Sequence, residues 1–304
     1  MIVIAPNFLR LPSGLHFPAL EQGVTDMTTT KTILLIHGMF MTPRSWEPFR
    51  GYYESRGFRV LTPPWPRMQG EVEDIRRDPS PLNGLGTTEI VDHYDGIIRQ
   101  LDQPPIVMGH SVGGLFVQML LDRGLGAVGV GIDAAAPKGV LRLPWSQIRS
   151  LSPVLLNPAN FSRTVGLTFP QFRYAFANKM SDVDAMKVYQ RNAIPVPGRL
   201  VFQAGLANLN PWAATRVNYL NDRRAPLLLI AGSDDHTVPA SVDRSTLRKY
   251  RNSKAITDFK EFPGRTHLIV AQDGWEEVAE YALTWANDRL QTPSIKRSIR
   301  AAAS

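Results

Sequence analysis

Residues 104–122 read PPIVMGHSVGGLFVQMLLD, and this stretch predicts a buried strand, a tight turn and a helix in direct succession. Residues 106–108 form the short apolar run expected of a buried strand, and the two prolines before them interrupt any earlier element. From Leu115 to Leu120 the apolar residues recur at helical spacing. Ser111 therefore lies on the turn between the strand and the helix.

The turn around Ser111 has the properties expected of a nucleophile site. Gly109 and Gly113 remove side chains where the strand and the helix crowd the turn, so Ser111 can hold a strained conformation with an exposed hydroxyl. The first amides of the helix point toward the same position and can donate hydrogen bonds to a developing oxyanion. The pattern matches the G-x-S-x-G nucleophile elbow in its strand–turn–helix context. A Gly/Ser-rich turn without chemistry, which is the alternative, would not require these flanks.

Short apolar strands alternate with helices on both sides of this stretch. Strands are expected at 32–36, 58–61, 106–108, 128–132, 226–230 and 257–262, and helices at 45–56, 87–101, 241–250 and 275–290. Residues 67–86 are polar and rich in Gly and Pro, which predicts a long surface loop. The alternation predicts an α/β fold with a doubly wound, mostly parallel sheet.

The alternation is interrupted once, and this divides the chain into predicted parts. Residues 140–221 contain short, aromatic-rich pieces separated by prolines, and they predict a helical cap inserted into the core. The core then comprises residues 31–139 and 222–290. Residues 1–30 are expected to be an N-terminal extension and residues 291–304 a basic tail. In the alternative reading, the helices of 140–221 simply cover the sheet.

Composition excludes several classes of function. The net charge is +7, but Lys and Arg are scattered along the chain, and no recognition motif supports nucleic-acid binding. Without cysteine there is no disulfide, thiolate nucleophile or cysteine-based metal site. No segment offers about 20 consecutive apolar residues, so no membrane span is expected. Residues 1–20 lack the pattern of a signal peptide, and a cytoplasmic location is expected.

A serine nucleophile needs a base, which is itself oriented by a third group. Of the six histidines, His267 follows the last strand, where a loop at the carboxyl edge of the sheet can reach Ser111. The third group should be a carboxylate that follows a strand between these two residues. Asp234 and Asp235 are adjacent candidates on one turn and cannot both hold the imidazole, while Asp133 at another strand end is an alternative.

Over roughly residues 31–290 the chain resembles the α/β-hydrolase superfamily, in particular bacterial esterases and lipases. The resemblance rests on His37-Gly38, the elbow, the final histidine and a Gly-x-x-Asp-x-x-Val-Pro signature over residues 232–239. That signature favours Asp235 as the acid and leaves Asp234 as a turn residue. The superfamily members with aspartate at the elbow, haloalkane dehalogenases and epoxide hydrolases, are set aside because Ser111 occupies this position.

The resemblance also implies the surroundings of the nucleophile. The oxyanion donors would be the backbone amides of Met39 and Val112, with Phe40 a weaker candidate. Independently of the resemblance, the predicted cap should roof the site. Candidate substrate contacts are Phe40, His110, Phe172 and Phe176, the last two picked from the aromatic residues of the cap.

The resulting expectation is a serine hydrolase that needs neither a metal nor another cofactor and cleaves carboxylic esters of small or medium-sized apolar substrates. A small-molecule ester is the expected partner. Hydrolysis of a lactone or a carbon–carbon bond by the same triad is one alternative, and a non-hydrolytic ligand-binding protein on this fold is another.

Overall fold

The computed structural model describes residues 30–291, so His16, nearly all of the predicted extension and the tail after residue 291 lie outside the described part. Its centre is a six-stranded sheet with the order β2-β1-β3-β4-β7-β8, in which every neighbouring pair is parallel. The strands are β1 (Thr32–Ile36), β2 (Arg59–Leu61), β3 (Ile106–His110), β4 (Val128–Ile132), β7 (Leu227–Gly232) and β8 (Thr257–Phe262). The predicted doubly wound, mostly parallel sheet is confirmed.

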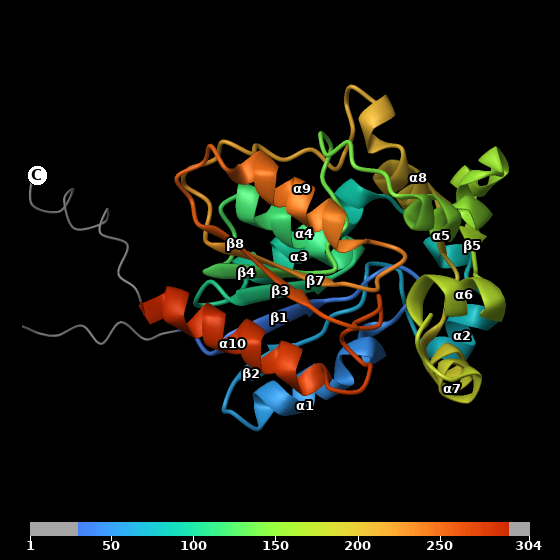
Figure 1. Cartoon of the computed structure of the whole chain (residues 1–304), viewed down its shortest axis with the longest axis horizontal. Coiled ribbons are helices and arrows are strands. Elements are labelled where there is room, and N and C mark those ends of the chain that lie inside the picture. The colour runs from blue at the N-terminus through green and yellow to red at the C-terminus, as the bar shows by residue number, and fades with distance from the viewer. Residues whose placement is uncertain (1–29, 292–304) are drawn as a thin grey trace, which may run out of the picture.

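Helices cover both faces of this sheet (Figure 1). Strand β1 shows why, because its side chains alternate between two buried clusters. Ile33 and Leu35 pack with residues of α1 and α10, whereas Leu34 and Ile36 pack with residues of α3 and α4. The helix bounds are α1 (Glu47–Glu54), α3 (Thr87–Arg99), α4 (Val112–Asp122), α9 (Ala240–Tyr250) and α10 (Trp275–Gln291).

Residues 67–86 differ from the long surface loop that was expected. They contain helix α2 (Val72–Arg77) and a 3-10 turn (Ser80–Leu82). Apolar side chains of this segment are buried in the core, including Met68, Ile75 and Leu82. Because the helix is short and charged residues separate its apolar side chains, the sequence shows no clear helical period here.

Between β4 and β7 the chain forms a cluster of helices beyond one end of the sheet (Figure 1). The elements are α5 (Trp145–Leu155), α6 (Phe169–Phe176), α7 (Asp182–Asn192), α8 (Gly198–Gly205), 3-10 turns at Pro158–Ser162 and Ala207–Leu209, and the two-residue strands β5 (Thr164–Val165) and β6 (Val196–Pro197). The two strands pair in antiparallel fashion and were not expected. None of the helices within residues 30–291 is long and apolar enough to cross a membrane.

Candidate active site

The order of the strands in the sheet indicates where a ligand site should lie. Strand β1 lies between β2 and β3, so the chain winds outward in opposite directions from the β1–β3 pair. Ligand sites of open α/β sheets lie at the carboxyl ends of the strands at such a reversal. His37 and Gly38 follow β1 there, and Ser111 follows β3.

Ser111 occupies a strained turn that its glycine neighbours make possible. Its backbone has φ 57° and ψ −121°, a conformation that L-residues rarely adopt. A methyl group on Gly109 would lie 2.2 Å from the carbonyl oxygen of Gly113, and one on Gly113 would lie 2.2 Å from that of Ile36. Only glycine fits at these two positions. The turn directs the Ser111 side chain toward the loops at the strand ends.

His267 connects Ser111 to a carboxylate. Its Nε2 lies 3.0 Å from Ser111 Oγ, and its Nδ1 lies 2.6 Å from Asp235 Oδ2. All three side chains are buried. The His110 Nε2–H donates to the His267 carbonyl oxygen over 2.8 Å, and the Phe176 ring packs edge-on against the His267 imidazole at 4.9 Å. The imidazole is therefore held on several sides.

The two adjacent aspartates have different environments. Oδ1 of Asp235 accepts hydrogen bonds from the amides of Thr237 (2.6 Å) and Val238 (2.8 Å), which leaves Oδ2 for His267. The Asp234 carboxylate instead lies 3.3 Å from Lys179 Nζ. The structure thus brings Asp235, and not Asp234, to His267.

Asp133, the alternative acid, lies near the same histidine but not in contact with it. Its Oδ2 is 3.9 Å from His267 Nδ1, and its Oδ1 accepts a hydrogen bond from the Gly232 amide over 2.7 Å. Burial, and then the neighbouring charge of Asp235, raise the pKa of the Asp133 carboxyl well above its usual range. The surroundings of the Asp133 carboxyl therefore favour its neutral form.

Asp133→Asn is expected to change kcat/KM for an ester by less than about 10-fold, because asparagine has the shape of the neutral acid and keeps an acceptor for the Gly232 amide. The raised pKa also means that part of the wild-type stability, present at low pH, is lost as the pH rises toward that pKa. The variant should lose less stability over this range. Activity assays and chemical unfolding across pH test both points. A loss of several orders of magnitude would instead identify Asp133 as the working acid.

Backbone amides close to Ser111 are available for an oxyanion. A methyl group on Gly38 would lie 2.9 Å from Ser111 Cβ, so the loop after β1 passes directly beside the nucleophile. In the described part of the chain, neither the Met39 amide nor the Val112 amide donates to a protein acceptor. Phe40 has φ 63°, and its carbonyl accepts from the Ile194 amide, which ties this loop to the segment after α7.

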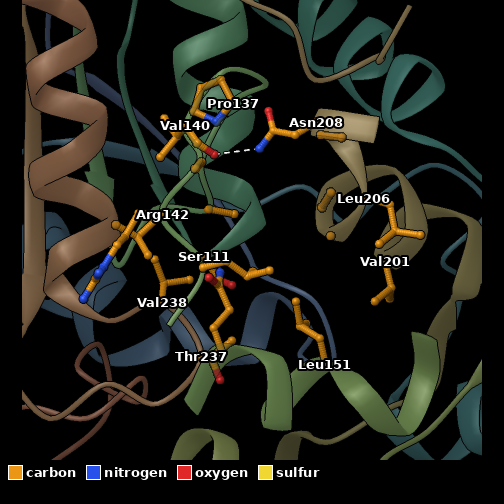
Figure 2. Close-up of a pocket in the computed structure, with 18 of the residues that line it drawn as sticks. Ser111, Pro137, Val140, Arg142, Leu151, Val201, Leu206, Asn208, Thr237 and Val238 are labelled. Atoms are coloured by element: carbon orange, nitrogen blue, oxygen red, sulfur yellow. Dashed lines mark hydrogen bonds between the residues drawn. The ribbon is translucent and has the colours of Figure 1, made fainter. Parts of the chain in front are cut away.

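Ser111 lines a cavity of about 250 Å³. One wall comes from residues 135–137 after β4 and from Thr237 and Val238 of the acid loop. Across from it lie Leu151 of α5, Val201 of α8, and Leu206 and Leu209 after α8, while Leu141 and Leu143 before α5 also line the cavity. Figure 2 shows Ser111 between these two walls, with Leu151, Val201 and Leu206 across from Thr237 and Val238.

The four candidate substrate contacts are not among the residues that line this cavity. Phe172 and Phe176 stack on each other at 4.8 Å, and both are buried. Phe40 packs edge-on against Phe176 at 6.3 Å, and His110 is buried against His267. Phe176 and His110 contact the His267 side chain directly, and Phe40 and Phe172 pack against Phe176. The cavity is instead lined by aliphatic residues, which repeat less conspicuously in the sequence than the aromatic ones.

Among residues 30–291, one cluster has the composition of a metal site, namely His110, Asp133 and His267, whose donor atoms lie within 4.8 Å of one another. A metal ion on His267 would displace Ser111 or Asp235 from an imidazole nitrogen, since both nitrogens are engaged. The Nε2 of His110 is engaged as well. We therefore assign no metal to this cluster.

Residues 33–281 match the family model described as the alpha/beta hydrolase family. No curated protein gave a significant sequence match. Among solved structures, the monoacylglycerol lipase of Paleococcus ferrophilus is 21% identical with a TM-score of 0.59, covering 86% of this chain and 96% of that one.

An extracellular alpha/beta-hydrolase from a Paenibacillus species is 21% identical with a TM-score of 0.63, covering 84% of this chain and 98% of that one. A pyrethroid hydrolase from Sphingobium faniae JZ-2 is 18% identical with a TM-score of 0.58, covering 85% and 98%. At these identities the similarity establishes the shared fold.

Proposed function

The chain belongs to the alpha/beta hydrolase family, and from this premise we propose that it is a serine hydrolase that cleaves carboxylic esters with an apolar acyl group. One observation carries the proposal. Contacts run from Asp235 through His267 to Ser111, and Ser111 lines a cavity whose walls are mostly aliphatic. A serine, an oriented base and a mostly apolar pocket together fit acyl transfer from an apolar ester.

The reaction begins when Ser111 Oγ attacks the ester carbonyl carbon while His267 Nε2 takes the hydroxyl proton. Asp235 holds Nδ1–H and stabilises the imidazolium that forms. The amides of Met39 and Val112 are the proposed donors to the oxyanion. His267 then gives its proton to the leaving alcohol, and an acyl-serine remains. Water, activated by the same imidazole, hydrolyses this intermediate and restores Ser111.

The cavity limits the substrate class. It offers about 250 Å³ lined largely by aliphatic side chains, and among the polar side chains in its wall Gln147 has a buried Oε1 without a protein partner. Such a space suits a medium-length or branched hydrocarbon group better than a sugar or a charged group. A panel of p-nitrophenyl esters of increasing acyl length tests this, and we expect kcat/KM to rise from acetate to a medium-length acyl group.

Ala204→Phe is expected to reverse this preference. Ala204 lies on α8 and lines the cavity, so a phenyl group there occupies space needed by a long acyl chain. The ratio of kcat/KM for a long ester to that for acetate should fall by about 10-fold or more, since one methylene misfit in an apolar pocket is worth roughly 10–200-fold. Ala159→Phe is the matched control, because Ala159 is exposed and does not line the cavity. Equal ratios in the two variants would show that the acyl group binds elsewhere.

A further inference from the structure

The mouth of the cavity is surrounded by apolar side chains that face solvent. Leu141 and Leu209 are each 78% exposed and also line the cavity with Ser111. Leu143 and Leu206 likewise combine exposure with a place in the cavity wall. The apolar surface outside the protein is therefore continuous with the apolar wall inside. We call Leu141, Leu143, Leu206 and Leu209, together with the two aromatic residues described next, the apolar rim.

The rim extends beyond the cavity. A second, shallower groove shares Leu206 and Leu209 with the cavity and is also lined by the exposed Phe161. Trp212 follows three residues after Leu209 and is 79% exposed. Contiguous exposed apolar surface is rare on monomeric proteins and marks an interaction site. Exposed tryptophan is typical of surfaces that meet a boundary between apolar and aqueous phases.

The charge of this part of the chain is one-sided. Residues 140–221 contain nine Lys or Arg and two acidic residues, so they carry +7, which equals the net charge of the whole chain. The basic residues are scattered along the sequence and form no cluster. The excess of positive charge in this segment arises because it contains few acidic residues. Both acids, Asp182 and Asp184, lie on α7 and pair with Arg173 and Lys187. The rest of the segment, which carries the rim, contains no acidic residue.

Four arginines of residues 140–221 have no carboxylate partner among the described residues. Within residues 30–291, the ion pairs include none formed by Arg142, Arg149, Arg163 or Arg216. Arg142 lines the cavity, and Arg149 lies on α5 with its guanidinium over the Tyr174 ring, 4.0 Å from the ring centre. Arg163 lies two residues after Phe161, and Arg216 lies four residues after Trp212. Arginines elsewhere in the segment are paired, for example Arg191 with Glu47. Unpaired arginines around exposed apolar side chains complement a surface that combines hydrocarbon with negative charge.

We propose that the apolar rim and its four arginines dock the protein on the surface of aggregated anionic lipid. The rim side chains enter the acyl layer, and the arginines meet the anionic head groups. Insofar as the proposed esterase activity holds, an ester substrate would pass from the lipid layer along Leu141 and Leu209 to Ser111 without crossing water. The docking itself does not depend on that activity.

Vesicle sedimentation with the whole chain tests the docking. We expect binding to vesicles of phosphatidylcholine containing about one third phosphatidylglycerol, and much weaker binding to phosphatidylcholine alone. Binding should weaken when salt rises from about 0.1 M to about 1 M, which shortens the Debye length from about 10 Å to about 3 Å. The triple variant Arg149→Glu, Arg163→Glu, Arg216→Glu should bind on the order of 10²-fold more weakly, since each basic residue near an anionic surface contributes about 1 kcal/mol.

A matched control makes the same change of charge at the other end of the strands. Arg223, Arg251 and Lys254 are exposed and lie near the starts of β7 and β8. Their replacement by glutamate should leave vesicle binding close to that of the wild type. Phe161→Ser with Trp212→Ser tests the apolar component and should lower binding by about 10-fold or more. Circular dichroism establishes that each variant is folded.

The outcomes separate the docking from the esterase proposal. Hydrolysis of soluble p-nitrophenyl acetate should be unchanged in the rim variants, since none of their substituted residues lines the cavity with Ser111. Vesicle binding without any ester hydrolysis would leave the docking intact and contradict the proposed function. Equal binding of the wild type and the triple variant would overturn the docking. The docking would also be overturned if the wild type sediments as a dimer and the Phe161 and Trp212 changes convert it to a monomer. The rim would then bind a second copy of the chain.

Discussion

Replacing Ser111 with alanine is expected to lower kcat for p-nitrophenyl butyrate by about 10⁶-fold, the size of effect seen when a serine hydrolase loses its nucleophile. Alanine keeps Cβ and the strained backbone of the turn and removes only the Oγ that lies 3.0 Å from His267. The melting temperature should therefore change little while turnover is lost. Steady-state kinetics and a thermal melt of the same preparation measure both quantities.

Ser150→Ala is the matched control. Ser150 is also buried, and its hydroxyl donates to the carbonyl of His236 in the acid loop. Its loss should leave kcat within a few-fold of the wild type. A fluorophosphonate should form one covalent adduct, on Ser111, and none with the Ser111→Ala protein. An adduct on another serine, or turnover by the alanine variant that withstands repurification, would refute the nucleophile assignment.

The sheet could be predicted from the sequence because its strands carry local signals. Runs such as residues 32–36 and 106–108 are uniformly apolar, as expected for strands buried on both faces of a parallel sheet. The nucleophile elbow could also be predicted, because close contacts within the turn and with the neighbouring strand β1 require glycine at positions 109 and 113. Ser111 and His267 lie 156 residues apart in sequence, yet the topology places them at one edge.

The cavity wall could not be predicted, because the direction of a helix face depends on its tertiary neighbours. Phe172 and Phe176 are four residues apart on α6 and share a face, which the sequence indicates. That face packs against His267 and Phe40 and does not line the cavity. The aliphatic residues that do line the cavity, such as Val201 and Leu206, have no distinguishing spacing in the sequence.

Short helices and strands could not be predicted from the sequence for a related reason. Helix α2 has only 6 residues, of which Val72 and Ile75 are buried. Two apolar residues do not define a period, and the Gly and Pro residues around them favour a loop. The helix forms because Glu71 and Asp74 cap its first turn and its apolar side chains enter the core. The core contacts that decide its conformation come from elements distant in sequence.

Asp235→Asn is expected to lower kcat by about 10⁴-fold, as in serine proteases that carry the equivalent change. Oδ1 of Asp235 accepts two amide hydrogen bonds, from Thr237 and Val238. In the variant the amide oxygen must take these donors, so the NH₂ group faces His267 Nδ1. The imidazole must then accept at Nδ1 and carry its proton on Nε2. In this tautomer Nε2 cannot take the proton of Ser111, and the base is lost although the fold is kept.

Asp234→Asn is the control from the adjacent position. Its carboxylate pairs with Lys179 at the surface, and loss of an exposed ion pair of this kind costs about 0–1 kcal/mol of stability and should not affect the imidazole. Its kcat should stay within about 3-fold of the wild type, so the two variants should differ by more than about 10³-fold. NMR of the His267 ring protons should show the proton on Nδ1 in the wild type and on Nε2 in Asp235→Asn. The reverse ranking of the two variants would transfer the acid role to Asp234. Small effects from both, together with a large effect of Asp133→Asn, would transfer it to the carboxyl that lies 3.9 Å from the same nitrogen.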